Sequence, residues 1–139
     1  MSNIAILVMS HKEAAKAMLE SVEMIAGKQD NTKYICFYET MSNEDLMEEI
    51  EYATSSMNTE NGLCILTDLF GGTPFKVAYM YAQKSKSIQV ISGFNLPMLL
   101  DACLSRSILS LEELVDHIEY SSKNGIKTIG KSINNNEDE

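Results

Sequence analysis

Short apolar runs alternate with longer amphipathic stretches along most of this chain. Five of the runs have the length of a single strand, and all but the last are followed by apolar residues at helical spacing. The predicted strands are residues 4–10, 34–38, 63–68, 87–93 and 126–129. Strands that alternate with helices in this way favour an α/β fold, an open and mainly parallel sheet with helices on both faces.

The predicted helices lie between and after these strands, at residues 12–26, 43–53, 74–82, 98–104 and 111–124. The pattern Ser-x-x-Glu, which begins at Ser10 and again at Ser110, has the form of a capping box. Thr73 is predicted as the N-cap of the third helix, because Pro74 would then occupy the first helical position, where proline is favoured. With Ser10 as an N-cap, His11 is expected in the first turn of the first helix.

The composition is that of one soluble globular domain, with 139 residues, 45% hydrophobic and 22% charged. We expect the domain at residues 1–130 and an acidic, disordered tail at 131–139. No apolar run approaches the roughly 18 residues of a membrane span. The N-terminus lacks the basic region and cleavage site of a signal peptide. The sequence therefore predicts a cytoplasmic protein with no direct membrane insertion.

The net charge of −9 makes nucleic acid and anionic membranes poor partners, and it matches a basic protein partner better. Simple solubility is the other interpretation of most of these carboxylates. The cysteines, Cys36, Cys64 and Cys103, are widely separated in apolar surroundings, which favours buried and reduced thiols. Their spacing does not fit zinc, and neither histidine has a cysteine or a second histidine nearby. We therefore predict neither a metal site nor a cofactor.

A glycine-rich segment, Gly71 to Pro74, follows the third predicted strand and opens a helix. Two glycines let backbone N–H groups approach an anion closely, and a helix N-terminus attracts negative charge. The segment has neither the Walker pattern nor G-x-G-x-x-G, so it is not a standard nucleotide site. It is either an anion site or a turn in which glycine serves the backbone geometry alone.

His11 and Asp68 are the candidate catalytic residues, because both follow predicted strands at the carboxyl end of the sheet. A neutral imidazole at a helix N-terminus has a lone pair for attack on phosphorus. A carboxylate at Asp68 can hold one ring nitrogen and leave the other free. Each residue also has a structural interpretation, as an ordinary histidine and as the cap of a local turn. The other histidine, His117, lies on a late helix and is interpreted as a surface or half-buried residue.

Three motifs extend this interpretation: Ser-His followed by a helix at 10–26, D-L-F-G-G-T-P-F at 68–75, and G-F-N-L-P-M-L at 93–99. Together they resemble the mannose-type enzyme IIA domain of the bacterial phosphoenolpyruvate-dependent sugar phosphotransferase system. The resemblance covers nearly the whole chain, residues 4–129. The two longer motifs are specific when they occur together after successive strands.

The resemblance implies that His11 takes a phosphoryl group from phospho-HPr and passes it to a histidine of the enzyme IIB component during sugar uptake. Asp68 matches the aspartate that interacts with the imidazole. Gly71 and Gly72 match the backbone part of the phosphoryl-binding pocket, and Thr73 matches its hydroxyl. We expect enzyme IIB as a separate polypeptide, and the membrane components IIC and IID, which recognise the sugar, as indirect partners.

The resemblance also implies a homodimer in which the last strand, here 126–129, pairs antiparallel with the sheet of the neighbouring subunit. The chain departs from the family at Lys12, where many members have glycine. A lysine there either favours the phosphoryl group or alters docking with HPr. Two other functions stay open, a phosphoryl donor subunit for a dihydroxyacetone kinase and a regulatory module that senses phosphorylation state without transport.

Overall fold

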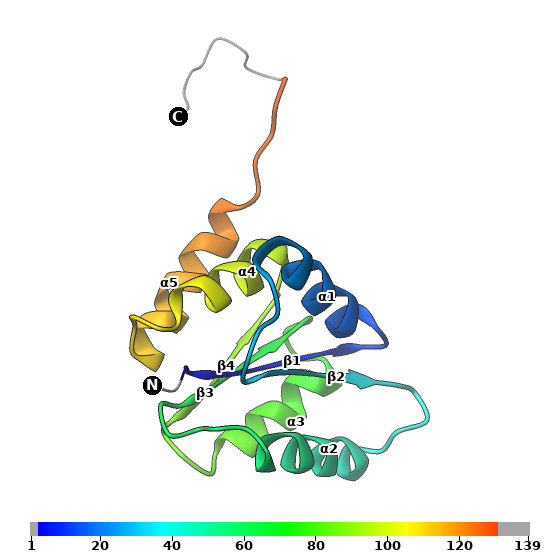
Figure 1. Ribbon diagram of the computed structural model, residues 1–139. Coiled ribbons are helices and arrows are strands. Elements are labelled where there is room, and N and C mark those ends of the chain that lie inside the picture. The colour runs from blue at the N-terminus through cyan, green and yellow to red at the C-terminus, as the bar shows by residue number, and fades with distance from the viewer. Residues whose placement is uncertain (1–2, 131–139) are drawn as a thin grey trace.

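The computed structural model describes residues 3–130 and contains one sheet of four parallel strands covered by five helices (Figure 1). The strands are β1 (Ala5–His11), β2 (Thr32–Phe37), β3 (Leu63–Thr67) and β4 (Ile88–Ser92). The helices are α1 (Ala14–Ala26), α2 (Asn43–Ser55), α3 (Thr73–Ala82), α4 (Leu96–Ser105) and α5 (Leu111–Asn124). The predicted α/β class and the helices on both faces are confirmed.

The two faces of the sheet have separate cores, because side chains alternate in direction along each strand. On one face, Ile6 and Val8 of β1 pack with α1, α4 and α5. On the other face, Leu7 and Met9 of β1 pack with α2 and α3 (Figure 1). Since both faces are covered, β1 and β3 consist of buried apolar residues almost throughout.

The strand order is β2-β1-β3-β4. The connection from β1 to β2 therefore runs toward one edge of the sheet, and the connection from β3 to β4 runs toward the other. The carboxyl ends of these two central strands therefore lie next to each other at the point where the order reverses. Their register pairs Met9 with Thr67, which places His11 and Asp68 at neighbouring strand ends. In open α/β sheets this is the usual place for a binding site.

The predicted fifth strand is absent from the described single chain, where residues 126–129 follow α5 without regular structure. Ile126 and Ile129 are 79% and 97% exposed. A strand needs a neighbour to bond its backbone, and none of the described part of the same chain pairs with this segment. The predicted tail at 131–139 lies outside the described residues.

Two of the predicted N-caps are wrong, and α1, α3 and α4 begin one or two residues from the predicted positions. Ser10 is not the N-cap of a capping box, because β1 continues through His11 and α1 begins at Ala14 with Glu13 as its N-cap. Thr73 is the first residue of α3 rather than its cap, which is Gly72. The capping box at Ser110 is confirmed, with both of its hydrogen bonds present.

The three cysteines are unpaired, in agreement with the predicted reduced thiols, but only Cys64 is fully buried. Its burial raises the pKa of the thiol to about 12. Cys36 and Cys103 are half-buried rather than buried. Within residues 3–130, none of the helices combines the length and the apolar character needed to cross a bilayer.

Candidate active site

His11 is the last residue of β1, and its imidazole lies on the face of the sheet that carries α2 and α3. The side chain is 45% exposed, so one edge of the ring is open to a partner molecule. Its position in a strand corrects the expectation that it occupies the first turn of α1. A local reason is Lys12, whose φ of 48° turns the chain away from the sheet before the helix begins.

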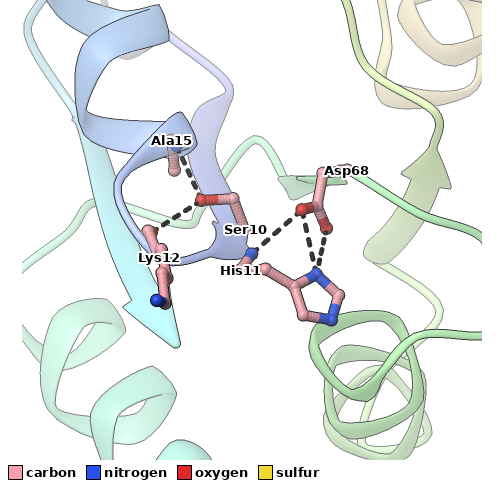
Figure 2. A network of polar contacts seen from close by, with 5 residues as sticks. All are labelled: Ser10, His11, Lys12, Ala15 and Asp68. Carbon is pink, nitrogen blue, oxygen red and sulfur yellow. Dashed lines mark hydrogen bonds and ion pairs between the residues drawn. The ribbon is translucent and has the colours of Figure 1, made fainter. Parts of the chain in front are cut away.

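Asp68 follows β3 directly and holds His11 at two points (Figure 2). Its Oδ2 accepts a hydrogen bond from the His11 backbone N–H at 2.9 Å and lies 3.0 Å from Nδ1 of the ring. The second carboxylate oxygen is 3.3 Å from Nδ1. An ionised carboxylate only accepts hydrogen bonds, so Nδ1 is the protonated nitrogen and Nε2 keeps its lone pair in the neutral ring. The predicted pairing of the two residues is present.

The loop after Asp68 closes tightly against the ring. The Gly72 N–H donates to Leu69 O at 3.0 Å, and Gly71 has a φ of 83°, a conformation that glycine adopts without strain. A Cβ on Gly72 would lie 2.9 Å from Cε1 of His11 and 3.5 Å from Nε2. Gly72 therefore gives the imidazole room, while its own N–H is used within the turn.

The helix N-terminus beside the ring is that of α3. The first bond within this helix runs from the Lys76 N–H to Gly72 O, at 2.9 Å. The N–H groups of Thr73 and Phe75 precede it and have no acceptor within the helix, and Pro74 has no N–H. These groups and the helix dipole attract an anion, and Thr73 adds a hydroxyl to the same turn.

Two further contacts of the site were not predicted. Phe37 of β2 packs its ring edge-on against His11, with the ring centroids 6.1 Å apart. Phenylalanine in a strand gives no chemical signal, and only the β1–β2 register, which pairs His11 with Phe37, brings it there. The second contact is made by the Ser10 hydroxyl. It forms hydrogen bonds with Lys12 O and with the Ala15 N–H behind His11, and not those of the capping box that its sequence suggests.

Lys12 is the residue at which the resemblance led us to expect glycine. Its backbone is left-handed, a conformation that glycine adopts without strain. The side chain points away from the imidazole (Figure 2). Its ammonium lies 3.8 Å from Glu39, and both side chains are exposed. The lysine is thus directed to the protein surface rather than to the ring.

An exposed apolar flank adjoins the site, formed by Leu69 and Phe70, which are 60% and 77% exposed. The Phe70 ring packs on Phe75 of α3 at 4.8 Å between centroids. An aromatic side chain held in this way beside a reactive residue is typical of a surface that meets another protein.

His117 lies apart from this site. On α5 it forms an ion pair with Asp101 of α4, with Nε2 2.9 Å from Oδ2, and its side chain is 46% exposed. The interpretation of His117 as a surface or half-buried helix residue is confirmed, and the residue is exposed. Within residues 3–130, no group of three or more histidine, cysteine, aspartate or glutamate side chains is arranged to hold a metal ion.

Fold and site together define a class, the open parallel α/β proteins that hold an aspartate-supported histidine and a helix N-terminus at the switch point of the sheet. A family model described as the PTS system fructose IIA component (EIIA-man) matches residues 5–119. The chain therefore belongs to this family of phosphotransferase system IIA components.

Several relatives support the assignment. The chain is 35% identical over 113 residues to the sorbose-specific EIIA component of Lacticaseibacillus casei, covering 81% of each. It is 32% identical over 127 residues to the mannose-specific EIIAB component of Escherichia coli K12, covering 91% of this chain and 39% of that longer protein. The chain thus spans well under half of the EIIAB relatives that it matches.

Solved structures agree with the fold. The crystal structure of a phosphotransferase system component EIIA from Streptococcus agalactiae superposes with a TM-score of 0.82 at 34% identity. That match covers 90% of this chain and 96% of the other. A mannose/sorbose-specific IIA subunit from Enterococcus faecalis gives a TM-score of 0.84 at 24% identity, covering 94% of this chain and 96% of the other. At this identity the match supports the fold alone.

Proposed function

We propose that this protein is a phosphohistidine carrier, which takes a phosphoryl group from phospho-HPr onto His11 and passes it to a histidine of an enzyme IIB component during sugar uptake. The observation that carries the proposal is the His11–Asp68 contact. It holds Nδ1 of the ring at 3.0 Å from the carboxylate and leaves Nε2 beside Gly72, at the N-terminus of α3.

In the proposed step, the Nε2 lone pair attacks the phosphorus of phospho-HPr. A bond forms between Nε2 and phosphorus, and the bond between phosphorus and its donor atom on HPr breaks, with the electron pair leaving on that atom. The ring gains positive charge as the new bond forms, and Asp68 stabilises it through Nδ1–H. The first-turn N–H groups of α3, with the Thr73 hydroxyl, would receive the negative oxygens. In the transfer to enzyme IIB, a histidine nitrogen of that protein attacks the phosphorus, and the bond between phosphorus and Nε2 of His11 breaks with its electron pair returning to Nε2.

The partners follow from the proposed relay. The apolar flank of Leu69 and Phe70 beside His11 fits successive docking by two proteins, and the net charge of −9 suits a basic surface on them. The relatives named for mannose and sorbose favour transport over a donor for dihydroxyacetone kinase. Membrane components IIC and IID would take part only through enzyme IIB, and the relay would operate in the cytoplasm.

A homodimer is part of this proposal. β4 is an edge strand of half-buried residues, and a cavity of about 730 Å³ lies along it, lined also by Phe75, Tyr79 and Ser122. Residues 126–129 leave α5 with their isoleucines exposed. Pairing of this segment with β4 of a second copy would cover both surfaces and bond the free edge of the sheet.

The test is phosphorylation from labelled phosphoenolpyruvate in the presence of enzyme I and HPr. The wild-type protein should acquire one acid-labile, alkali-stable phosphoryl group, and His11→Ala should acquire none. His117→Ala is the matched control, because it removes the other histidine, which lies away from the site in an ion pair with Asp101. Undiminished labelling of His11→Ala would overturn the proposal.

A further inference from the structure

The hydroxyl of Ser10 joins three parts of the chain behind the reactive histidine. Ser10 is fully buried, and its Oγ donates to Lys12 O at 3.0 Å and accepts from the Ala15 N–H at 2.7 Å (Figure 2). The Ala15 N–H belongs to the first turn of α1 and has no acceptor within that helix. The side chain of Glu13, the N-cap, makes no capping bond. Ser10, a residue of β1, thus caps the N-terminus of α1.

The turn that Ser10 holds is under backbone strain. Lys12 has a φ of 48°, a left-handed conformation that is unfavourable for an L-residue with a side chain. Two bonds keep it there: the Lys12 N–H donates to Phe37 O at 2.7 Å, and its carbonyl accepts from the Ser10 hydroxyl. One bond lies on each side of the strained residue. Removing the Ser10 hydroxyl frees the carbonyl side of the turn.

His11 stands directly between these two residues. Its backbone N–H and its Nδ1 both contact Oδ2 of Asp68, at 2.9 and 3.0 Å, so the orientation of the ring depends on the backbone at this position. The ring is nearly half exposed and packs edge-on against Phe37, which leaves packing too weak to hold it alone. A shift of the Lys12 turn therefore passes directly to the imidazole.

We propose that Ser10 is a positioning residue for His11. Its hydroxyl fixes the Lys12 turn, so that Nδ1 stays on Asp68 and Nε2 remains the open nitrogen. The kinetic part of this inference rests on the proposed phosphoryl transfer, whereas the geometric part does not. Without the hydroxyl the ring divides between two tautomers and orientations, and only one of them presents Nε2 to a phosphoryl donor.

The first test reads the tautomer of His11 by ¹⁵N–¹H NMR at about pH 8.5, where an ordinary imidazole is neutral. Wild type should show the Nδ1–H form alone, and Ser10→Ala a mixture with the Nε2–H form. Ser10→Cys keeps the size of the side chain with weaker hydrogen bonds, and decides the question if the alanine variant fails to fold. His117 serves as an internal reference, since its signals should not change.

The second test is kinetic. In Ser10→Ala, kcat for labelling by phospho-HPr should fall about 10- to 100-fold while KM stays within about twofold, because orientation is lost and docking is not. The control is Thr54→Val. It deletes a hydroxyl bonded to Ile50 O and to the Tyr81 hydroxyl, both at 2.9 Å, in the last turn of α2, which leads to the amino end of β3.

The outcomes separate the two proposals. A single Nδ1–H tautomer in the Ser10 variants, or a wild-type kcat, overturns the role of Ser10. If the wild-type protein accepts no phosphoryl group, the proposed function fails, and the tautomer spectrum still decides whether Ser10 orients His11.

Discussion

Asp68 binds His11 twice through the same carboxylate oxygen, at 2.9 Å from the backbone N–H and 3.0 Å from Nδ1. The first contact joins the ends of β1 and β3, and the second sets the rotation of the ring. One carboxylate therefore fixes the strand end, the tautomer and the direction of Nε2. A neutral acceptor can replace the backbone contact, but only an ionised one stabilises positive charge on the imidazole.

Replacing the carboxylate by an amide, Asp68→Asn, should slow phosphoryl transfer without unfolding the protein. The charge-assisted part of the contact with Nδ1 is lost, which is worth about 1.5–3 kcal/mol and so about 10- to 100-fold in rate. Single-turnover labelling measures the rate, and circular dichroism checks the fold. Transfer at the wild-type rate would contradict the orienting role of Asp68.

Gly72→Ala should impair labelling through a clash with the ring. The backbone of Gly72, with φ of −73°, accepts alanine, but the added Cβ would lie 2.9 Å from Cε1 of His11. The matched control is Gly125→Ala. Its φ of −76° also accepts alanine, and its Cβ would lie 2.7 Å from Pro97, away from the imidazole. Both variants should lose stability, measured by urea unfolding, while only Gly72→Ala should lose labelling rate.

The pairing of His11 with Asp68 was predictable from the sequence because it follows from topology. Both residues end apolar strands, and the carboxyl ends of parallel strands meet at one edge of the sheet. The place of Gly71 and Gly72 beside the site was also predictable, since the pair lies between a strand and a helix. The separate role of Gly72 was not predictable from the sequence. Gly72 makes room for the imidazole, and its N–H closes a turn by donating to Leu69 O.

The mistaken predictions share a cause, because each used a local pattern where a distant contact decides. Ser10 and Glu13 have capping-box spacing, yet the β1–β2 pairing extends through His11 and its partner Phe37, which delays the helix. Residues 126–129 are a different case, because the predicted strand needs a second copy to pair with and the described single chain holds no neighbour for it. The sequence analysis did not identify Arg106 as a structural residue, although it is buried and its guanidinium donates to Ile4 O at 3.0 Å.

Lys12→Gly should stabilise the protein by about 0.5–1 kcal/mol, because glycine adopts the left-handed conformation without strain and this gain outweighs the additional chain entropy that glycine loses on folding. The exposed ion pair with Glu39, at 3.8 Å, adds little that could be lost. Urea unfolding measures the difference. Labelling of His11 should remain, since the lysine side chain points away from the ring.

Asn31→Gly provides the contrast to Lys12→Gly. Asn31 has a similar φ of 54°, but its side-chain amide donates to Asn3 O and to Asn58 O, at 3.1 and 2.8 Å. The same substitution should therefore destabilise the protein there. A loss of stability at Lys12 would contradict backbone strain as the governing effect there, and a stabilisation at Asn31 would contradict the contribution of its two side-chain hydrogen bonds.

The stabilising effect of Asp101 should depend on pH. Partial burial opposes ionisation of this carboxyl, but hydrogen bonds from Ser105 and Ser121 and the ion pair with His117 outweigh it and lower the pKa below the ordinary 3.8. A lowered folded-state pKa contributes stability above the unfolded pKa, and this is lost as the pH falls through the folded value. The difference in unfolding free energy between wild type and Asp101→Asn should therefore be largest near neutrality and shrink in acid.

Urea unfolding at a series of pH values measures that difference. Asp116→Asn, on the exposed side of α5, controls for the loss of one negative charge. A difference between wild type and Asp101→Asn that stays constant down to about pH 3, below the ordinary aspartate pKa, would show that the contacts of Asp101 do not favour its ionised form.

Removing residues 126–139 should convert the proposed dimer to a monomer, because the deletion takes away the segment that would pair with β4. Light scattering measures the mass, and a chain ending at Gly130 serves as the control that keeps Ile126 and Ile129. The truncated protein should still be labelled on His11, since Asp68 and Gly72 contact the imidazole within one chain. A monomeric 139-residue protein would contradict the proposed dimer, and a truncated protein that still dimerises would place the contact elsewhere. Loss of labelling together with the dimer would instead mean that the second copy completes the site.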